Sequence, residues 1–269
     1  MPTDCRAPIA LFLFAHQDDE FGVFDQIERE RRAGRRVLCV YVTDGAATAD
    51  PARRDAESHA VLAQLGVTSE DIRFIGGQLG IHDCGLHTRV DAFYRWLEAF
   101  VCSSLAIDAC FIPAWEGGHP DHDLLHAVAV RLFAARGQLS LLRQYALYHG
   151  KGCAGPFFRV LSPLAENGPV ETRRIAWPDR FRHLRFCLGY PSQWRSWGGL
   201  FPFVCLRYLH SGRQQLQPVN PARLTQRPHD GVLYYERRAF LDWPTMCAAV
   251  GQIPVPDGRN TQDVQPAVG

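Results

Sequence analysis

The chain has 269 residues, which is enough for one large α/β domain with a well-filled core. Its 29 Lys and Arg balance 28 Asp and Glu, the net charge is +1, and 46% of the residues are hydrophobic. These values exclude a disordered chain and a nucleic-acid binder held by a strongly positive surface. No run approaches the roughly 20 apolar residues of a membrane span, so we expect none.

The cysteine pattern indicates a reducing compartment. There are nine cysteines, an odd number, and they include no C-x-x-C pair that would suggest a thiolate zinc site. The N-terminal segment lacks the basic region and long apolar run of a signal peptide. We therefore expect reduced cysteines and a cytoplasmic protein.

The first 150 residues alternate between apolar runs typical of buried strands and segments with helical spacing. The predicted strands cover residues 9–15, 36–43, 71–75 and 106–113, with a fifth near 145–149. The predicted helices cover residues 21–33, 51–65, 89–101 and 120 to about 135. This alternation predicts an α/β fold, with a Rossmann-like, mostly parallel sheet that has helices on both faces, over residues 1–150.

Beyond Gly150, turn signals follow one another at short intervals, and one helix is predicted over residues 180–188. We expect residues 151–253 to be an irregular C-terminal extension that completes the substrate cleft, and residues 254–269 to be a mobile tail. An aromatic cluster in this extension suits a sugar-stacking wall, a lipid-facing patch, or simply core or interface. Its members are Tyr190, Trp194, Trp197, Phe201 and Phe203.

The loop after the first predicted strand reads HQDDE, residues 16–20. Three carboxylates and an imidazole here attract a cation, whereas a dinucleotide fold would carry G-x-G-x-x-G at this point. His16 and Asp19 are three residues apart across a strand-to-helix turn, so they can converge on one zinc ion. The alternative is that Asp18, Asp19 and Glu20 only complement the dipole of the next helix.

The loop after the predicted strand at 106–113 reads EGGHPDHDLLH, residues 116–126. Because ligands collect at the carboxyl ends of parallel strands, His119, Asp121 and His122 are expected to face the same cleft as the first loop. The alternative is that His119 caps the helix and that Asp121 and Asp123 complement its dipole. His122 and His126 also echo the H-E-x-x-H of zinc peptidases, with Asp in place of Glu.

Together, the two loops resemble the PIG-L, or LmbE-like, family of zinc-dependent N-deacetylases. The matching motifs are AHQDDE at 15–20, where the family has AHPDDE, and GHPDH at 118–122. The resemblance covers about residues 8–150 and includes T-D-G at 43–45, R-x-x-E at 54–57 and D-x-G-L at 83–86, with a weaker Y-x-S-Q at 190–193. Gln17 replaces the family proline, so we expect a loosened or reshaped turn.

The resemblance implies one Zn²⁺ per chain, with His16, Asp19 and His122 as its protein ligands. It also implies that Asp18 is the general base and that His119 stabilises the oxyanion and, if protonated, gives a proton to the leaving amine. Asp121 is expected to orient an imidazole.

Three further residues are candidates for contacts to sugar hydroxyls: Arg54, Asp83 and Asp44. Each falls in a loop or helix start at the carboxyl edge of the sheet. For Arg54 the alternative is an i,i+3 pair with Glu57 on a solvated helix face.

The leading function is hydrolysis of the N-acetyl group of an amino sugar in a glycoconjugate, nucleotide sugar or glycoside. The alternative of another class is a non-catalytic sugar- or nucleotide-sugar-binding module, and a third is a zinc peptidase using His122 and His126. We expect a small-molecule or glycoconjugate substrate and no nucleic-acid partner; a homo-oligomer is compatible with the sequence.

Overall fold

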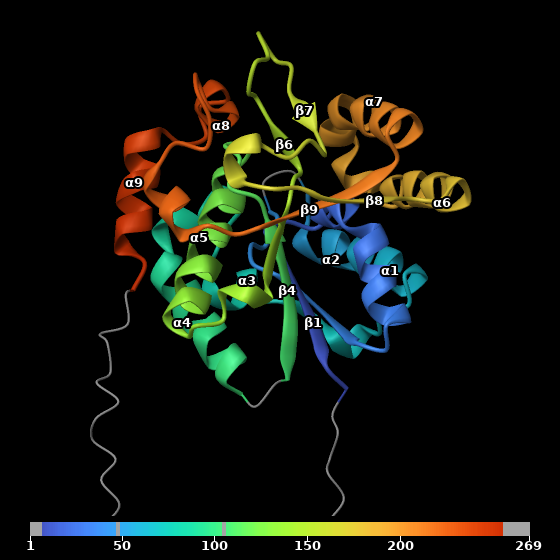
Figure 1. Cartoon of the computed structure of the whole chain (residues 1–269), viewed down its shortest axis with the longest axis horizontal. Coiled ribbons are helices and arrows are strands. Elements are labelled where there is room, and N and C mark those ends of the chain that lie inside the picture. Colours follow the sequence, from blue (N-terminus) through green and yellow to red (C-terminus); the bar gives the residue numbers. More distant parts are fainter. Residues whose placement is uncertain (1–6, 47–48, 104–105, 255–269) are drawn as a thin grey trace, which may run out of the picture.

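The computed structural model describes residues 7–46, 49–103 and 106–254. A seven-stranded sheet runs through it in the order β3-β2-β1-β4-β5-β9-β8 (Figure 1). Its strands are β1 (Ile9–Phe14), β2 (Arg36–Tyr41), β3 (Ile72–Phe74), β4 (Ile107–Pro113), β5 (Leu142–Tyr145), β8 (Glu171–Arg174) and β9 (Arg213–Pro218). The first five strands are parallel, and β9 is antiparallel to both β5 and β8. The predicted Rossmann-like, mostly parallel sheet is confirmed.

Helices cover both faces of this sheet (Figure 1). One face carries α1 (Phe24–Arg32), α2 (Pro51–Gln64), α6 (Trp177–Cys187) and α7 (Trp194–His210). The other carries α4 (Val90–Cys102), α5 (Pro120–Ala135) and α9 (Trp243–Gln252). Because side chains alternate along a strand, Leu11 and Leu13 of β1 enter one core, and Phe12 and Phe14 enter the other.

Shorter elements connect these layers. The short α-helices are α3 (Gly76–Leu79) and α8 (Tyr234–Arg237), and β6 (Tyr148–His149) pairs with β7 (Arg159–Val160) in a separate hairpin. The 3₁₀ helices are η1 (Asp19–Gly22), η2 (Ser69–Asp71), η3 (Leu86–Thr88), η4 (Leu139–Leu141), η5 (Ala165–Asn167), η6 (Pro191–Gln193) and η7 (Pro221–Thr225).

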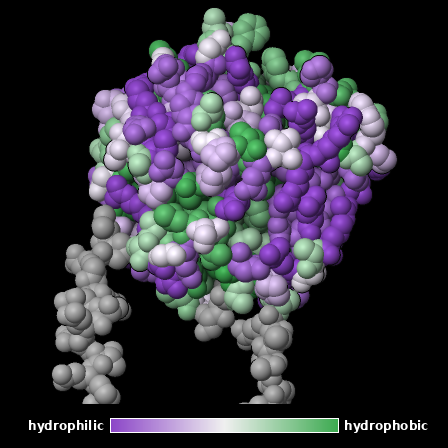
Figure 2. All heavy atoms as spheres, in the orientation of Figure 1, coloured by the Kyte–Doolittle hydropathy of each residue, from purple (hydrophilic) through white to green (hydrophobic). Residues whose placement is uncertain are grey.

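The helix after the first loop shows how the sequence produces these layers. Phe24 and Ile27 of α1 are fully buried against the sheet, whereas Arg31 and Arg32 are exposed. Figure 2 shows hydrophilic side chains over the outer surface of α1. The amphipathic spacing of this segment therefore determines which side of the helix packs on the sheet.

The fifth strand begins earlier than the sequence predicted. The central sheet contains β5 at Leu142–Tyr145, whereas residues 148 and 149 belong to the separate hairpin. The cause lies in the second loop: the buried Glu116 carboxylate accepts hydrogen bonds from the amides of Leu147 (2.7 Å) and Tyr148 (2.9 Å). These amides are thereby taken out of the ladder, and the chain leaves the sheet after Tyr145.

The C-terminal extension contains more regular structure than its turn signals predicted. The predicted helix at 180–188 is α6, but α7 has 17 residues although it contains Pro202, and α9 packs against α5 and α4. The strands β9 and β8 continue the central sheet beyond β5. Burial of Trp197, Val204 and Tyr208 stabilises α7 despite its poor local signal. The division of the chain near residue 150 remains a prediction.

The described part of the chain contains no helix that is both long and apolar enough to cross a membrane. Eight cysteines are described, and all are free. Cys5 and the predicted tail, apart from Pro254, lie outside the described residues.

Candidate active site

The first loop lies at the carboxyl end of β1, where the strand order reverses between β2 on one side and β4 on the other. Such a switch point opens a crevice in doubly wound sheets. Asp18 has φ 114°, a left-handed conformation that is rare for a non-glycine residue and common at functional sites. With this conformation, the carboxylates of Asp18 and Asp19 point to different partners: Asp18 faces Arg54, and Asp19 faces His122.

The turn that contains Gln17 is held closed by hydrogen bonds. The Gln17 carbonyl accepts a hydrogen bond from Arg54 Nη2 (2.7 Å), and the Gln17 side chain donates to Asp55 Oδ1 (2.7 Å). The amide of Asp18 donates to Glu20 Oε2 (2.8 Å). Side-chain hydrogen bonds thus hold the turn where the family has proline.

Asp19 is fixed by the strand end. Its Oδ2 accepts the amides of Ala15 (3.0 Å) and His16 (2.8 Å), which leaves Oδ1 directed at His122 Nε2, 3.0 Å away. Burial raises the pKa of Asp19, but His122 and His16 outweigh burial and hold it well below its usual value. Asp19 is therefore a carboxylate, the form that binds a metal.

The second loop presents His122 from the first turn of α5. Asp123 orders this loop by accepting hydrogen bonds from the amides of Glu116 (3.1 Å) and Gly117 (3.1 Å). His122 Nε2 lies 3.2 Å from His16 Nδ1. The buried His122 Nδ1 has no hydrogen-bond partner among the described residues.

His16, Asp19 and His122 bring one ligand atom each to a common point. His122 Nε2 lies 3.0 Å from Asp19 Oδ1 and 3.2 Å from His16 Nδ1, and His16 Nδ1 lies 3.7 Å from the other carboxylate oxygen, Asp19 Oδ2. Nitrogen and oxygen ligands of tetrahedral zinc at about 2.0–2.1 Å lie about 3.3–3.4 Å apart. The donor set and its spacing therefore fit a zinc ion with a fourth position open.

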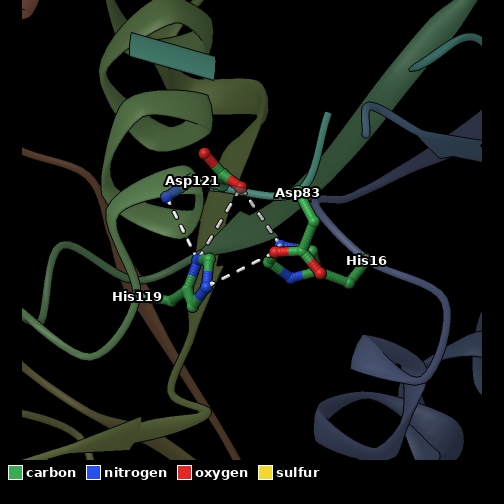
Figure 3. Close-up of side chains that lie close together, drawn as sticks. All are labelled: His16, Asp83, His119 and Asp121. Atoms are coloured by element: carbon green, nitrogen blue, oxygen red, sulfur yellow. Dashed lines mark hydrogen bonds and ion pairs between the residues drawn. The ribbon is translucent and has the colours of Figure 1, made fainter. Parts of the chain in front are cut away.

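Asp121 holds the far side of the His16 ring. Its Oδ2 lies 3.2 Å from His16 Nε2, and its carboxylate also accepts the amides of Cys84 (2.7 Å) and Leu86 (3.1 Å). Figure 3 shows Asp121 between the rings of His16 and His119. This is the carboxylate–histidine contact that fixes the tautomer of a metal ligand, so that His16 Nδ1 is free to bind.

His119 is the N-cap residue of α5, so the capping alternative is also correct. Its Nδ1 accepts the amide of Asp121 (3.3 Å), which leaves the proton on Nε2. Burial, and secondarily the neighbouring His16, lower the pKa of His119 to about 3. This environment favours a neutral Nε2–H donor over the protonated imidazole considered from the sequence.

Asp18 lies beside the triad of candidate ligands, His16, Asp19 and His122, without joining it. Its nearest charged partner is Arg54, with Nη2 at 3.7 Å from Asp18 Oδ1. Burial raises the pKa of Asp18 to about 8, against the attraction of Arg54. A raised pKa makes the ionised Asp18 carboxylate a stronger base, and the neighbouring Arg54 favours that ionised form.

Arg54 and Asp83 both lie at the floor of the cavity beside the candidate ligands. Arg54 is not on a solvated helix face. Arg54 is 3% exposed, donates to the Gly45 carbonyl (2.6 Å) and lies 3.6 Å from Asp83 Oδ2. Arg53, not Arg54, pairs with Glu57. Asp83 also faces His16 Nε2 at 3.3 Å.

The structure does not place Asp44 in the cavity. Its carboxylate contacts His82 Nδ1 (2.6 Å) and accepts the amide of Asp83 (3.3 Å). Asp44 therefore positions the loop that carries Asp83, and its expected contact with a sugar stays a prediction.

A cavity of about 480 Å³ opens above this floor. Its aromatic lining comes from elements distant in sequence: Phe21, Tyr148, Phe158, Tyr234 and Phe240. The remaining lining includes Cys84 at the floor and residues of η6, α7 and the segment after α8, namely Gln193, Arg195, Ser196, Gly199, Leu200 and Arg238.

The aromatic cluster predicted from the sequence does not form this lining. Tyr190 and Trp197 are buried in the core, Phe201 and Phe203 pack against it, and Trp194 is 67% exposed. Sequence reasoning missed the actual aromatic lining, because its residues are scattered from η1 to the segment after α8 without a common motif.

His126 is not a partner of His122 in a peptidase-like site. The buried His126 donates from Nδ1 to the carbonyl of Pro113 (2.9 Å). It is absent from the metal-binding groups of the described residues and from the cavity lining. His126 lies one helical turn after His122 in α5, and its side chain is buried in the core.

Comparisons with known proteins agree with this architecture. Residues 11–133 match the PIG-L family model, described as GlcNAc-PI de-N-acetylase. No curated protein matches the chain significantly.

Solved structures share the fold at low identity. A deacetylase of the A40926 pseudoaglycone has 18% identity and a TM-score of 0.56, with 84% of this chain and 100% of that chain covered. A zinc-inhibited form of teicoplanin deacetylase has 17% identity and a TM-score of 0.57, with coverages of 79% and 98%. N,N'-diacetylchitobiose deacetylase from Pyrococcus horikoshii has 18% identity and a TM-score of 0.55, with coverages of 80% and 83%. Residues 11–133 are therefore similar to the PIG-L family, and the chain shares its fold with the solved structures of these deacetylases.

Proposed function

We propose that this protein removes the N-acetyl group from an N-acetylated amino sugar in a glycoconjugate, nucleotide sugar or glycoside, releasing acetate and a free amine. The observation that carries the proposal is the convergence of His16, Asp19 and His122 on one point, with Asp18 and His119 beside it on the floor of one cavity. The reaction is a hydrolysis of a linear amide.

We further propose one catalytic Zn²⁺ per chain, held by His16 Nδ1, Asp19 Oδ1 and His122 Nε2. When bound, zinc supplies Lewis acidity and lowers the pKa of a coordinated water. Asp121 keeps His16 in the tautomer that leaves Nδ1 available.

Asp18 is the proposed general base. It takes the proton of the attacking water, and Arg54 stabilises its carboxylate form. Neutral His119 donates its Nε2–H to the oxygen of the acetamide carbonyl as negative charge develops there. The proton that Asp18 has taken is available for the departing amine.

The cavity above the floor supports a sugar substrate. Aromatic faces bind the apolar faces of sugar rings, and Tyr148, Phe158 and Tyr234 contact one another as a continuous wall. Arg54 and Asp83 offer a donor and an acceptor for hydroxyl groups at the floor. The eight free described cysteines support the proposal of a reducing, cytoplasmic location.

A panel of N-acetyl-hexosamine conjugates tests this function by measuring acetate and primary amine released in equal amounts. The zinc-loaded protein is expected to turn over at least one class, and Asp18→Asn is expected to lose this activity while keeping its metal. Sugar binding without acetate release from any conjugate would instead favour the non-catalytic binding module.

A further inference from the structure

Cys84 is a thiol on the floor of the cavity that the proposed reaction does not use. It follows Asp83 in the loop before η3 and has φ 62°, a left-handed conformation. Its amide donates to Asp121 Oδ2 (2.7 Å), and this bond fixes the loop against α5. The thiol is thus held next to His119 and Asp83.

Three different donor atoms meet at this point. Cys84 Sγ lies 3.5 Å from His119 Nε2 and 3.6 Å from Asp83 Oδ1, and His119 Nε2 lies 3.7 Å from Asp83 Oδ1. Around tetrahedral zinc, with sulfur at about 2.3 Å and nitrogen or oxygen at about 2.0–2.1 Å, such atoms lie about 3.3–3.6 Å apart. In Figure 3, His119 and Asp83 face each other and a dashed line joins them.

We infer that Cys84 Sγ, His119 Nε2 and Asp83 Oδ1 form a second metal site, for a thiophilic divalent cation such as Zn²⁺. The site shares no ligand with the triad of His16, Asp19 and His122. A thiolate, an imidazole and a carboxylate together favour zinc over Mg²⁺ or Ca²⁺, which take oxygen ligands.

Binding of an ion at this site changes the protons on Cys84 and His119. The thiol proton of Cys84 is released to solvent as the sulfur binds, because the thiolate is the ligand. The His119 proton moves from Nε2 to Nδ1, which faces Asp121 Oδ2 at 3.9 Å, and the long 3.3 Å cap bond is given up. His119 stays neutral, so one proton leaves per ion bound.

Occupation of this site removes His119 Nε2 from the substrate. An ion here therefore inhibits deacetylation while the first site keeps its own metal. This consequence rests on the proposed function, whereas the binding itself does not.

Cobalt titration of the metal-stripped protein tests the site without any turnover, because a thiolate ligand gives Co²⁺ a near-ultraviolet charge-transfer band. We expect two Co²⁺ per wild-type chain at saturation, with the band present. Cys84→Ser is expected to bind one Co²⁺ without the band. Asp19→Ala is expected to bind one Co²⁺ and keep the band, and Cys247→Ser, which changes an exposed thiol of α9, is expected to match wild type.

Loss of the band in Cys84→Gly, whose backbone accepts φ 62° readily, would support the site even if Cys84→Ser folded poorly. A wild-type protein without the band, or a band that persists in Cys84→Ser, would overturn it. In acetate-release assays, Cys84→Ser should raise the concentration of excess Zn²⁺ that halves the rate by about 10-fold or more. Equal sensitivity of the variant and wild type would overturn the inhibition. A protein without deacetylase activity would still give the cobalt result.

Discussion

His16 and His122 lie 106 positions apart in the chain, yet their Nδ1 and Nε2 atoms approach to 3.2 Å. Each residue follows the end of a parallel strand, and β1 and β4 are neighbours in the sheet. The convergence of the two imidazoles is thus a product of strand order, and the proposed chemistry depends on it.

Removal of any one triad side chain is expected to lower metal affinity. His16→Ala, Asp19→Ala and His122→Ala should each bind zinc at least about 10-fold more weakly, because each loses a direct ligand. Elemental analysis after dialysis checks this. His126→Gln is the control, since His126 contacts the Pro113 carbonyl and should leave zinc binding intact. Full metal in two of the three triad variants would refute the site.

Asp18 and Asp19 are neighbours with different expected roles. Asp18→Asn should keep its zinc and lose roughly 10²–10⁴-fold in kcat, the usual contribution of a positioned general base. Asp50→Asn is a matched control, because Asp50 caps α2 and asparagine also caps helices. Near wild-type turnover by Asp18→Asn would leave Asp18 as a helix-dipole acid only.

His119→Ala should keep the triad metal and lose kcat and kcat/KM together. Loss of one oxyanion donor reduces kcat by about 10²–10³-fold. The Asp121 N–H donates to His119 Nδ1, so the proton that His119 offers to the substrate is on Nε2. Glutamine can also donate a hydrogen bond, so His119→Gln should retain part of the rate. Steady-state kinetics with parallel metal analysis separates these cases. Metal loss from the triad in His119→Ala would contradict the assignment.

The aromatic wall is expected to act on substrate binding. Phe240 lines the cavity, so Phe240→Ala should raise KM by roughly 2- to 10-fold with little change in kcat, as expected for loss of one ring contact. Phe181→Ala removes an exposed ring of α6 that does not line the cavity and serves as the control. Equal KM values for the two variants would argue against substrate contact at Phe240.

His149 should make the fold less stable in acid. Its Nε2 donates to the Ser162 carbonyl (2.9 Å) and its Nδ1 accepts the Lys151 amide (3.2 Å), so its ring is neutral. Burial lowers the pKa of His149 to about 4. Since the unfolded chain binds this proton below about pH 6.5, the stability present above that pH is lost as pH falls toward 4, by about 2 kcal/mol at pH 5.

Urea unfolding at pH 7 and pH 5 measures this loss. His149→Gln should show a smaller difference between the two pH values than wild type, whereas His210→Gln, at the exposed end of α7, should show the wild-type difference. An unchanged difference in His149→Gln would assign the acid sensitivity to other groups.

Much of the site was predictable because its chemistry is local in sequence. The HQDDE and GHPDH segments each follow an apolar run, and their residue types suit a bound cation such as zinc, while the resemblance to the PIG-L family implied that Asp18 is a free carboxylate beside it. The alternation of strands and helices then implied that both loops end at one edge of a sheet. No sequence motif marks Cys84 as a candidate ligand. A single cysteine beside Asp83 indicates no metal site until the fold places His119 next to it.

The sequence by itself determined the class of fold and the two loops that carry the candidate metal ligands, because hydrophobic periodicity and ligand spacing act over a few residues. Tertiary structure alone decided which side chains form the cavity. It placed Asp44 behind the loop of Asp83, buried Tyr190 and Trp197 in the core, and brought Tyr148 and Phe240 to the wall. It also formed α7 across Pro202, because packing against the sheet outweighed the local preference for a turn. Contacts of this kind depend on how distant segments share one core, and no local pattern encodes that.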